Sequence, residues 1–355
     1  MSKVVIKVGS NLLIKQTGEI DKSYIIELAR VVSGLKGNGH TCILITSGAK
    51  AAGYGKAQKA NVEEDLYIKQ ALCAIGQVQL MKLYELAFDM YDEKVAQILI
   101  NRDDFGHRER FLNLRNTLIG LNEMGFIPIA NENDTVSTNE ITFGDNDILA
   151  AMTAIGWKSD YLLLLSSVDG LLDGNDKLIK TFTPETKLKK IEKTQWGSGG
   201  IETKVRAARA ASAAGVSCCI CNGRNLANIQ RFIHGENPGT KFEPSKMPGS
   251  KKAWIGFLSK SNGEIIINEG AKKALMMKKS LLPVGIIAVS GSFTIGDVID
   301  VKTADGFQIG RGIANFSANQ AKKIIGCQST QIKEKLHYDS PNCFIHVDNF
   351  WLSTN

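Results

Sequence analysis

The sequence predicts an α/β domain with a mostly parallel sheet, followed by a small β-rich domain. From residue 1 to about residue 232, strand-like and helix-like segments alternate, which is the pattern of parallel strands joined by helices. After about residue 252, short strand-like segments with frequent glycines replace that alternation. Because 355 residues exceed the usual length of a single domain, we expect one large and one smaller domain.

The first part of the chain supplies the alternating elements. Apolar runs predict strands at 4–8, 41–46, 95–100, 127–130, 161–165 and 216–220. Helical periodicity predicts helices at 23–35, 66–91, 110–124, 148–155 and 203–214. Right-handed crossovers between such strands bring their carboxyl ends to one edge of the sheet, so the functional loops are expected there.

A linker near residue 240 separates the two predicted domains. The stretch 235–252 loses periodicity and collects Pro, Gly and Lys. We therefore predict a first domain at 1–237, a linker at 238–252 and a second domain at 253–355. The second domain has predicted strands at 264–267, 284–289, 297–301 and 307–311, as in a small β-barrel or sandwich.

The composition favours a protein of the cytoplasm. The first residues, Met1 to Lys7, contain no apolar stretch long enough for a signal peptide, and the apolar run 281–289 is too short to span a bilayer. The seven cysteines are scattered, which is typical of reduced thiols in a cytosolic compartment. We expect a soluble, cytoplasmic protein with no membrane contact.

The net charge of +7 is concentrated in the last third of the chain, where residues 235–355 hold 15 Lys and Arg against 10 Asp and Glu. Such an excess is compatible with contact to nucleic acid. It is at least as compatible with an ordinary solubilising surface, so both interpretations stay open.

The sequence offers little support for a resident metal. Cys218 and Cys221 form a C-x-x-C, but no second Cys or His pair lies at zinc-ligand spacing. The run 216–221 alternates like a strand, so we expect these cysteines in the core. Any metal should therefore arrive with a substrate.

Two segments rich in carboxylates and amides indicate a functional site. Gly144-Asp145-Asn146-Asp147 directly precedes the predicted helix at 148–155, and Asn131-Glu132-Asn133-Asp134 follows the predicted strand at 127–130. One polar residue is enough to cap a helix. Because several gather here, at the end of a strand, we favour a site over a cap.

Glycine-containing loops follow the first two strands. Lys7, Gly9 and Ser10 close the first strand and suit a phosphate, because Gly9 permits close backbone approach and Lys7 supplies a positive charge. Ser47 and Gly48 close the second strand and suit a carboxylate, although an ordinary turn explains them equally well.

A third glycine loop, 198–204, opens the last helix of the first domain. Its free N–H groups favour an anion, and Lys204 in the predicted first turn is unfavourable to the helix itself, which indicates that an anion binds there. The alternative interpretation is that the two glycines only form a flexible loop before the helix.

The chemistry indicated is phosphoryl transfer on an unusual scaffold. Neither a Walker A motif nor the protein-kinase motifs are present. Lysines on separate glycine loops, with carboxylates between them, fit direct in-line transfer without a covalent intermediate.

Taken together, these motifs resemble the glutamate 5-kinases of the amino-acid kinase family. The resemblance rests on Lys7, Gly9 and Ser10, on 46–49, 131–134 and 144–147, and on 198–204. The tail resembles a PUA domain at Trp254-Ile255, 270–275, 281–283 and 291–297. This similarity covers essentially the whole chain.

The resemblance implies an open, mainly parallel eight-stranded sheet sandwiched by helices, with a β-barrel-like PUA domain behind it. It implies a phosphotransferase that uses ATP, with Mg²⁺ carried by the nucleotide, to phosphorylate the γ-carboxylate of L-glutamate to L-glutamyl 5-phosphate, the first step of proline biosynthesis. It also implies proline as a feedback inhibitor and a homo-oligomer, dimer or tetramer.

The resemblance assigns roles to particular residues. Lys7 and Lys204 would stabilise the transferring group, and Asp147 would hold both lysines. The implied glutamate site consists of Ser47, Gly48, Asn131, Asp134, Asp145 and Asn146. The implied ATP site consists of Lys7, Gly9, Ser10, Ser166, Ser167, Ser198, Gly199, Gly200, Ile201, Glu202, Thr203 and Lys204.

Two positions depart from the family pattern. Ser167 stands where the family has an acid before its nucleotide-binding loop, and Lys50 stands where a small apolar residue is usual. The alternatives are another carboxylate kinase of the same superfamily, or a regulatory protein that binds RNA through its PUA domain. The Lys7, Asp147 and Lys204 set favours catalysis, because a sensor has no need of two phosphate lysines.

Overall fold

The computed structural model of the chain describes residues 1–15, 17–57, 65–136, 145–183, 186, 199–245, 250–336 and 341–353. The chain divides into two compact units. The first unit comprises Met1–Asp104 and Glu109–Met247, and the second comprises Phe105–Arg108 and Pro248–Asn355. No helix of the described part is both long and apolar enough to cross a membrane.

The first unit is built on an eight-stranded sheet with the order β3-β4-β2-β1-β5-β7-β8-β6. Its strands are β1 (Lys3–Val8), β2 (Thr41–Ile45), β3 (Lys94–Ile100), β4 (Phe126–Glu132), β5 (Tyr161–Ser166), β6 (Thr181–Phe182), β7 (Ser217–Asn222) and β8 (Thr240–Phe242). Every pairing is parallel except that of β7 with β8. The predicted α/β class and the mainly parallel eight-stranded sheet are confirmed.

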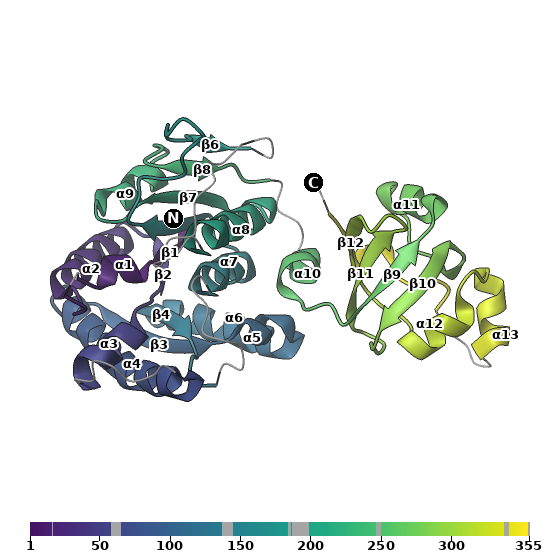
Figure 1. Cartoon of the computed structure of the whole chain (residues 1–355), viewed down its shortest axis with the longest axis horizontal. Coiled ribbons are helices and arrows are strands. Elements are labelled where there is room, and N and C mark those ends of the chain that lie inside the picture. Colours follow the sequence, from purple (N-terminus) through teal and green to yellow (C-terminus); the bar gives the residue numbers. More distant parts are fainter. Residues whose placement is uncertain are drawn as a thin grey trace. The chain divides into compact units, whose positions relative to one another are not determined.

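Helices cover both faces of this sheet (Figure 1). They are α1 (Ser10–Leu13), α2 (Lys22–Gly37), α3 (Ala49–Ala57), α4 (Leu66–Asp89), α5 (Arg102–Gly106), α6 (Arg108–Glu123), α7 (Asp145–Trp157), α8 (Gly199–Ala213) and α9 (Ala227–Ile233). The helices predicted from periodicity all appear, with ends that differ by a few residues.

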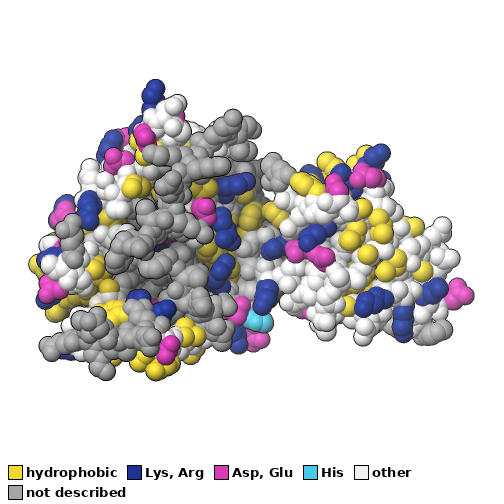
Figure 2. Space-filling view, in the orientation of Figure 1, with side chains coloured by type: hydrophobic (Ala, Val, Ile, Leu, Met, Phe, Trp, Pro, Cys, Tyr) yellow, Lys and Arg dark blue, Asp and Glu magenta, His cyan; other side chains and the backbone are white. Residues whose placement is uncertain are grey.

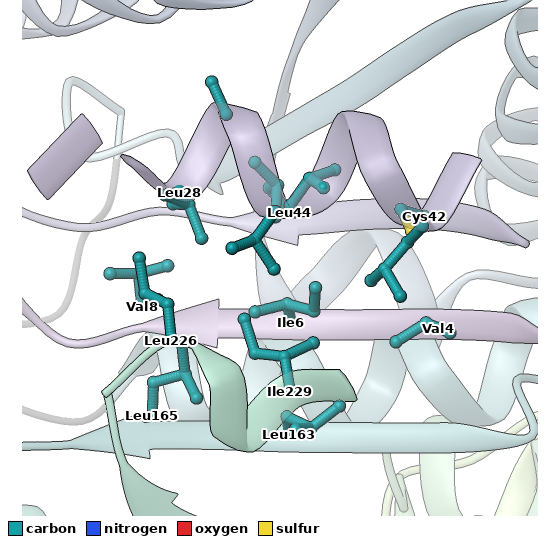
Figure 3. Close-up of a cluster of buried hydrophobic side chains, with 14 of the residues drawn as sticks. Val4, Ile6, Val8, Leu28, Cys42, Leu44, Leu163, Leu165, Leu226 and Ile229 are labelled. Carbon is teal, nitrogen blue, oxygen red and sulfur yellow. The ribbon is translucent and has the colours of Figure 1, made fainter. Parts of the chain in front are cut away.

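The core follows from the alternation of side chains along β1. Val4, Ile6 and Val8 point to one face, where they pack with residues of α2 and α9 such as Leu28 and Ile229 (Figure 3). Burying each such aliphatic side chain stabilises the fold by about 1.5–3 kcal/mol. The tight core fixes the register of β1, and therefore the position of the loop that follows it.

The strand order brings the functional loops together. Strands β4, β2, β1 and β5 are neighbours and run parallel, so their carboxyl ends, and the loops after them, share one edge of the sheet. Lys7, Ser47 and Asn131 all lie at this edge, although they are far apart in the sequence.

The second unit contains a mixed five-stranded sheet with the order β10-β9-β11-β12-β13. Its elements are α10 (Ser250–Ala253), a π-helical turn (Trp254–Leu258), β9 (Gly263–Ile267), α11 (Glu269–Met276), β10 (Ile286–Gly291), β11 (Val298–Thr303), β12 (Gln308–Ile313), α12 (Ala318–Ile324), α13 (Ile332–Leu336) and β13 (Phe350–Leu352). It has a separate core that includes Ile265, Ile299 and Phe344. The visible face of this unit mixes apolar side chains with basic and acidic ones (Figure 2).

The predicted linker at 238–252 is wrong for part of its length. Thr240–Phe242 form β8, which pairs with both β7 and β6 inside the large sheet. Both β6 and β8 are too short to show a periodic pattern. The predicted boundaries also miss Phe105–Arg108, which belong to the second unit, where the Trp254 indole donates a hydrogen bond to the Phe105 carbonyl (Nε1 to O, 3.0 Å).

The cysteine prediction is confirmed. Cys218 and Cys221 lie on β7 with fully buried side chains, as expected for core residues. Burial raises the pKa of the Cys218 thiol well above its usual range, which keeps it in the neutral form.

Candidate active site

The centre of the candidate site is a buried carboxylate between two ammonium groups. Asp147, in the first turn of α7, has its Oδ1 2.8 Å from the Lys7 Nζ of β1. Its other oxygen, Oδ2, lies 3.1 Å from the Lys204 Nζ of α8. Three separate elements therefore meet in one cluster, whose formal charge is positive.

Burial removes these three charged groups from water, which disfavours their charged forms. Asp147 is fully buried and Lys7 is 5% exposed. Burial lowers the pKa of the Lys7 ammonium, and the Lys204 charge adds to that shift while Asp147 opposes it. Burial alone would raise the pKa of Asp147, but Lys7 and Lys204 outweigh it and hold this pKa below its usual value. The carboxylate is thus what makes two neighbouring lysines tolerable here.

The start of α8 orients Lys204. The helix begins at Gly199, so Lys204 lies in its second turn and not in the first turn that we predicted. Lys204 Nζ donates to the Gly200 carbonyl at 3.3 Å, and Thr203 Oγ1 donates to Asp147 Oδ2 at 3.1 Å. An anion does lie beside Lys204, but it is the protein's own carboxylate.

Gly9 matters for its size. A Cβ at this position would lie 3.3 Å from the Leu165 carbonyl oxygen of β5 and 4.0 Å from Lys7 Nζ. Its backbone has φ −72°, so no left-handed conformation is involved. The glycine lets the turn into α1, which starts at Ser10, pass close to the end of β5.

A chain of amides lies at the ends of β2 and β4. Asn146 Nδ2 donates to Ser47 Oγ at 3.3 Å and to Asn131 Oδ1 at 3.0 Å. The backbone N–H of Glu132 donates to Asn131 Oδ1 at 3.0 Å. The two polar segments predicted to form a site are therefore in direct contact, and Ser47 joins them.

Gly48 and Asp134 complete this side of the site. Gly48 has φ +89°, a conformation that favours glycine, and it turns the chain from β2 into α3. Asp134 is half-buried after β4. Burial, the Asp134 charge and its hydrogen bond with the thiol raise the pKa of Cys73 to about 12, and the Lys50 charge opposes this shift. Lys50, the unusual residue, also lies over the Tyr54 ring, 5.8 Å from its centroid.

Residues of α4 beneath the site escaped the sequence analysis. Gln77 Oε1 accepts a hydrogen bond from Asn131 Nδ2 at 2.9 Å, and the Tyr84 hydroxyl lies 2.9 Å from Thr46 Oγ1. The only sequence signal was the presence of polar residues on the buried face of a mainly apolar helix.

The predicted nucleotide side is partly described. Ser166 ends β5 and is half-buried, whereas Ser167 is exposed. Of the α8 residues, Ile201 is half-buried and Glu202 is exposed. Ser198 lies outside the described residues, and so does the side chain of Asp145, which begins α7. Gly199 begins α8.

A cavity of about 270 Å³ lies elsewhere in the first unit. It opens at the amino ends of β5 and β7 and is lined by residues such as Asp160, Ser217 and Lys241. None of the predicted site residues lines it. The candidate site lies at the carboxyl ends of the parallel strands, and this cavity lies at their amino ends.

Comparison with known proteins supports the family resemblance that the sequence motifs indicated. The model of the amino acid kinase family matches residues 2–222, and that of the PUA domain matches residues 263–336. Among solved structures, the fold is similar to that of a carbamate kinase from Giardia, with a TM-score of 0.50 and 16% identity over 69% of this chain and 99% of that one.

Curated relatives match from end to end. The chain is 56% identical to a glutamate 5-kinase of Kosmotoga olearia over 100% of both chains, and 52% identical to one of Thermotoga maritima over 99% of both. Another, from Caldanaerobacter subterraneus, is 39% identical over 98% of this chain and 96% of the relative. The chain therefore belongs to the amino acid kinase family, as a glutamate 5-kinase with a PUA domain.

Proposed function

We propose that the protein transfers the γ-phosphoryl group of ATP to the γ-carboxylate of L-glutamate, giving L-glutamyl 5-phosphate and ADP. The observation that carries the proposal is the buried Lys7, Asp147 and Lys204 cluster beside the amide network of Ser47, Asn131 and Asn146. The end-to-end similarity to glutamate 5-kinases supports the choice of acceptor.

The reaction needs charge stabilisation more than it needs a base. An oxygen of the acceptor carboxylate attacks the γ-phosphorus, and the bond from that phosphorus to the β–γ bridging oxygen breaks as ADP leaves. The attacking group is already deprotonated, so no proton has to move. Lys7 and Lys204 offset the charge on the transferring group, and Asp147 holds both ammonium groups in place.

The amide network suits the acceptor. Ser47 Oγ accepts a hydrogen bond from Asn146, which leaves the hydroxyl proton of Ser47 to be donated to a glutamate carboxylate. Gly48 and Asp145, which precede or follow these residues in the sequence, are assigned to the same acceptor site. Asp134, half-buried after β4, supplies a carboxylate for the substrate ammonium.

The nucleotide is assigned to the glycine loops. Gly9, Ser10 and Gly200, with the N-terminus of α8, receive the phosphates, because the free N–H groups of a helix N-terminus favour anions. Mg²⁺ enters on the nucleotide, since phosphate oxygens are its preferred partners.

The test is ADP release from the purified protein with MgATP and one of L-glutamate, N-acetylglutamate, L-aspartate or no acceptor, with hydroxylamine present to trap acyl phosphate. A signal with glutamate alone, together with trapped γ-glutamyl hydroxamate, is the expected result. Transfer to N-acetylglutamate or aspartate would instead favour another carboxylate kinase of the superfamily. Silence with every acceptor, from folded protein that binds RNA, would favour a regulatory role.

Several features of the wider role complete the proposal. The product enters proline biosynthesis in the cytoplasm, proline acts as a feedback inhibitor, and the chain assembles as a dimer or tetramer. RNA contact through the PUA domain would add to catalysis without replacing it. Gel filtration, inhibition by proline and RNA filter binding test these points separately.

A further inference from the structure

Helix α4 presents a row of polar side chains to the candidate site. Cys73, Gln77 and Tyr84 are buried on one face of the helix, at spacings of four and seven residues. Each contacts a different residue at or just after the end of β2 or β4: Cys73 contacts Asp134, Gln77 contacts Asn131, and Tyr84 contacts Thr46. The helix therefore underlies the loops after both β2 and β4.

The hydrogen bonds fix the orientation of each amide in turn. Asn131 Oδ1 accepts from the Glu132 N–H and from Asn146 Nδ2, so the Asn131 amide nitrogen must be the group that faces Gln77. Gln77 Oε1 accepts from it at 2.9 Å. Gln77 thus begins a chain of contacts that runs through Asn131 and Asn146 to the Ser47 hydroxyl.

The backbone around Gln77 holds it in place. A Cβ on the preceding residue, Gly76, would lie 1.7 Å from the Ala49 carbonyl oxygen, and one on Gly53 would lie 2.0 Å from the Leu72 carbonyl oxygen. Helices α3 and α4 therefore touch through their backbones at this point. Because α3 follows directly after Ser47 and Gly48, Gln77 has a fixed position relative to the loop that carries them.

A residue that only filled space would not need an amide here. Gln77 is 9% exposed, and its Nε2 is buried without a hydrogen-bond partner among the described residues. A buried unpaired donor costs stability, and a leucine of similar size would avoid that cost. The carboxamide is therefore best explained by what its oxygen does for Asn131.

We propose that Gln77 is a positioning residue for the acceptor: it fixes the Asn131 amide and, through Asn146, the hydroxyl of Ser47 that meets the glutamate carboxylate. This inference rests on the proposed function, since it concerns the same acceptor site. Without the Gln77 oxygen, Asn131 Nδ2 loses its acceptor, and only the two hydrogen bonds to Asn131 Oδ1 still hold the amide. The positions of Asn146 and Ser47 are then less firmly fixed.

The test is the kinetics of Gln77→Leu in the full chain, with glutamate and MgATP varied separately. The expected result is a KM for glutamate raised about tenfold or more, with the KM for ATP within about twofold of that of the unaltered protein. Gln79→Leu is the matched control, because Gln79 lies on the same helix, is half-buried and makes no contact assigned to the site. It should leave both constants unchanged.

Two further measurements separate positioning from general damage. Gln77→Asn keeps an amide but withdraws its oxygen by one methylene, so it should also raise the KM for glutamate, and it serves if the leucine variant fails to fold. In a Ser47→Ala background, Gln77→Leu should raise the KM for glutamate by a smaller factor, because the Ser47 hydroxyl that the chain of hydrogen bonds positions is already absent.

The outcomes are distinct. A KM for glutamate within twofold of normal in a folded Gln77 variant, or KM values for glutamate and ATP that rise together, would overturn the positioning role. If the unaltered protein failed to phosphorylate glutamate, the proposed function would fail instead, whatever the variants did.

Discussion

At the scale of single residues, Lys7 and Lys204 are the sharpest test of the chemistry. Each ammonium contacts a different oxygen of Asp147, so neither can replace the other in position. Lys7→Ala or Lys204→Ala should lower kcat by on the order of 10²-fold or more, because the transition state loses a fixed positive charge. Lys22→Ala, at an exposed lysine of α2, is the control. Unchanged kcat in a folded Lys204 variant would remove that lysine from the mechanism.

Asp147 also links stability to pH. The folded protein holds the pKa of this carboxyl below its usual 3.8, so the unfolded chain binds the proton first as the pH falls. The stability that Asp147 contributes is therefore present above pH 3.8 and lost as the pH falls further, through the folded pKa. Other carboxyls titrate in the same window, so a matched variant is needed to isolate Asp147.

That variant is Asp147→Asn, which keeps the shape but cannot titrate. Urea unfolding from about pH 5 to about pH 3 should show a steeper loss of stability in the unaltered protein than in Asp147→Asn. The variant should also be less stable at neutral pH, because it leaves two lysines without their carboxylate. Parallel curves would mean that the Asp147 pKa is not held low.

At the scale of elements, the site depends on the close contact of α3 with α4. Gly76→Ala should destabilise the protein by about 3 kcal/mol, because its Cβ would meet the Ala49 carbonyl oxygen at 1.7 Å and the helices would have to separate. Gly55→Ala is the control: it lies in α3, and nothing lies within 4 Å of its Cβ. That substitution should be neutral, or stabilise by about 0.5–1 kcal/mol. Equal urea midpoints for both variants would contradict the tight contact.

The elements differ in how far the sequence predicts them. Strands β1, β2, β5 and β7 were predictable, because a buried strand is written in the sequence as a short continuous run of apolar residues. Strands β6 and β8 were not, because two or three residues carry no period and their pairing comes from β7. The residue pattern indicated lysines and carboxylates at one site, but the pairing of Asp147 with both Lys7 and Lys204 was expected only through the family resemblance.

The amide network was beyond any local pattern. Asn131 and Gln77 are 54 residues apart, and Asn146 and Ser47 are 99 apart, so their hydrogen bonds exist only once the sheet has ordered its strands. The direction of each amide follows from its neighbours, as the Asn131 carboxamide shows. The only hint in the sequence was that polar residues occur within α4, a mainly apolar helix. Hydrophobic periodicity did not show that these residues face the site.

At the scale of the whole molecule, catalysis and the PUA domain belong to separate compact units. The site residues named here all lie in the first unit, and each unit has its own apolar core. Cores that share few residues are expected to unfold in separate cooperative transitions. Stability and activity should therefore be separable by choosing in which core a cavity is made.

Two matched cavity variants test this separation. Ile299→Ala removes a fully buried side chain from the core of the second unit, and Leu163→Ala does the same on β5 of the first. Each substitution should lower the free energy of unfolding of its own unit by about 2–5 kcal/mol. Calorimetry should show this as a shift of one unfolding transition. Ile299→Ala should leave kcat and KM unchanged below that transition, because the first unit keeps its core. A single transition that moved as a whole in both variants would show that the two units fold as one.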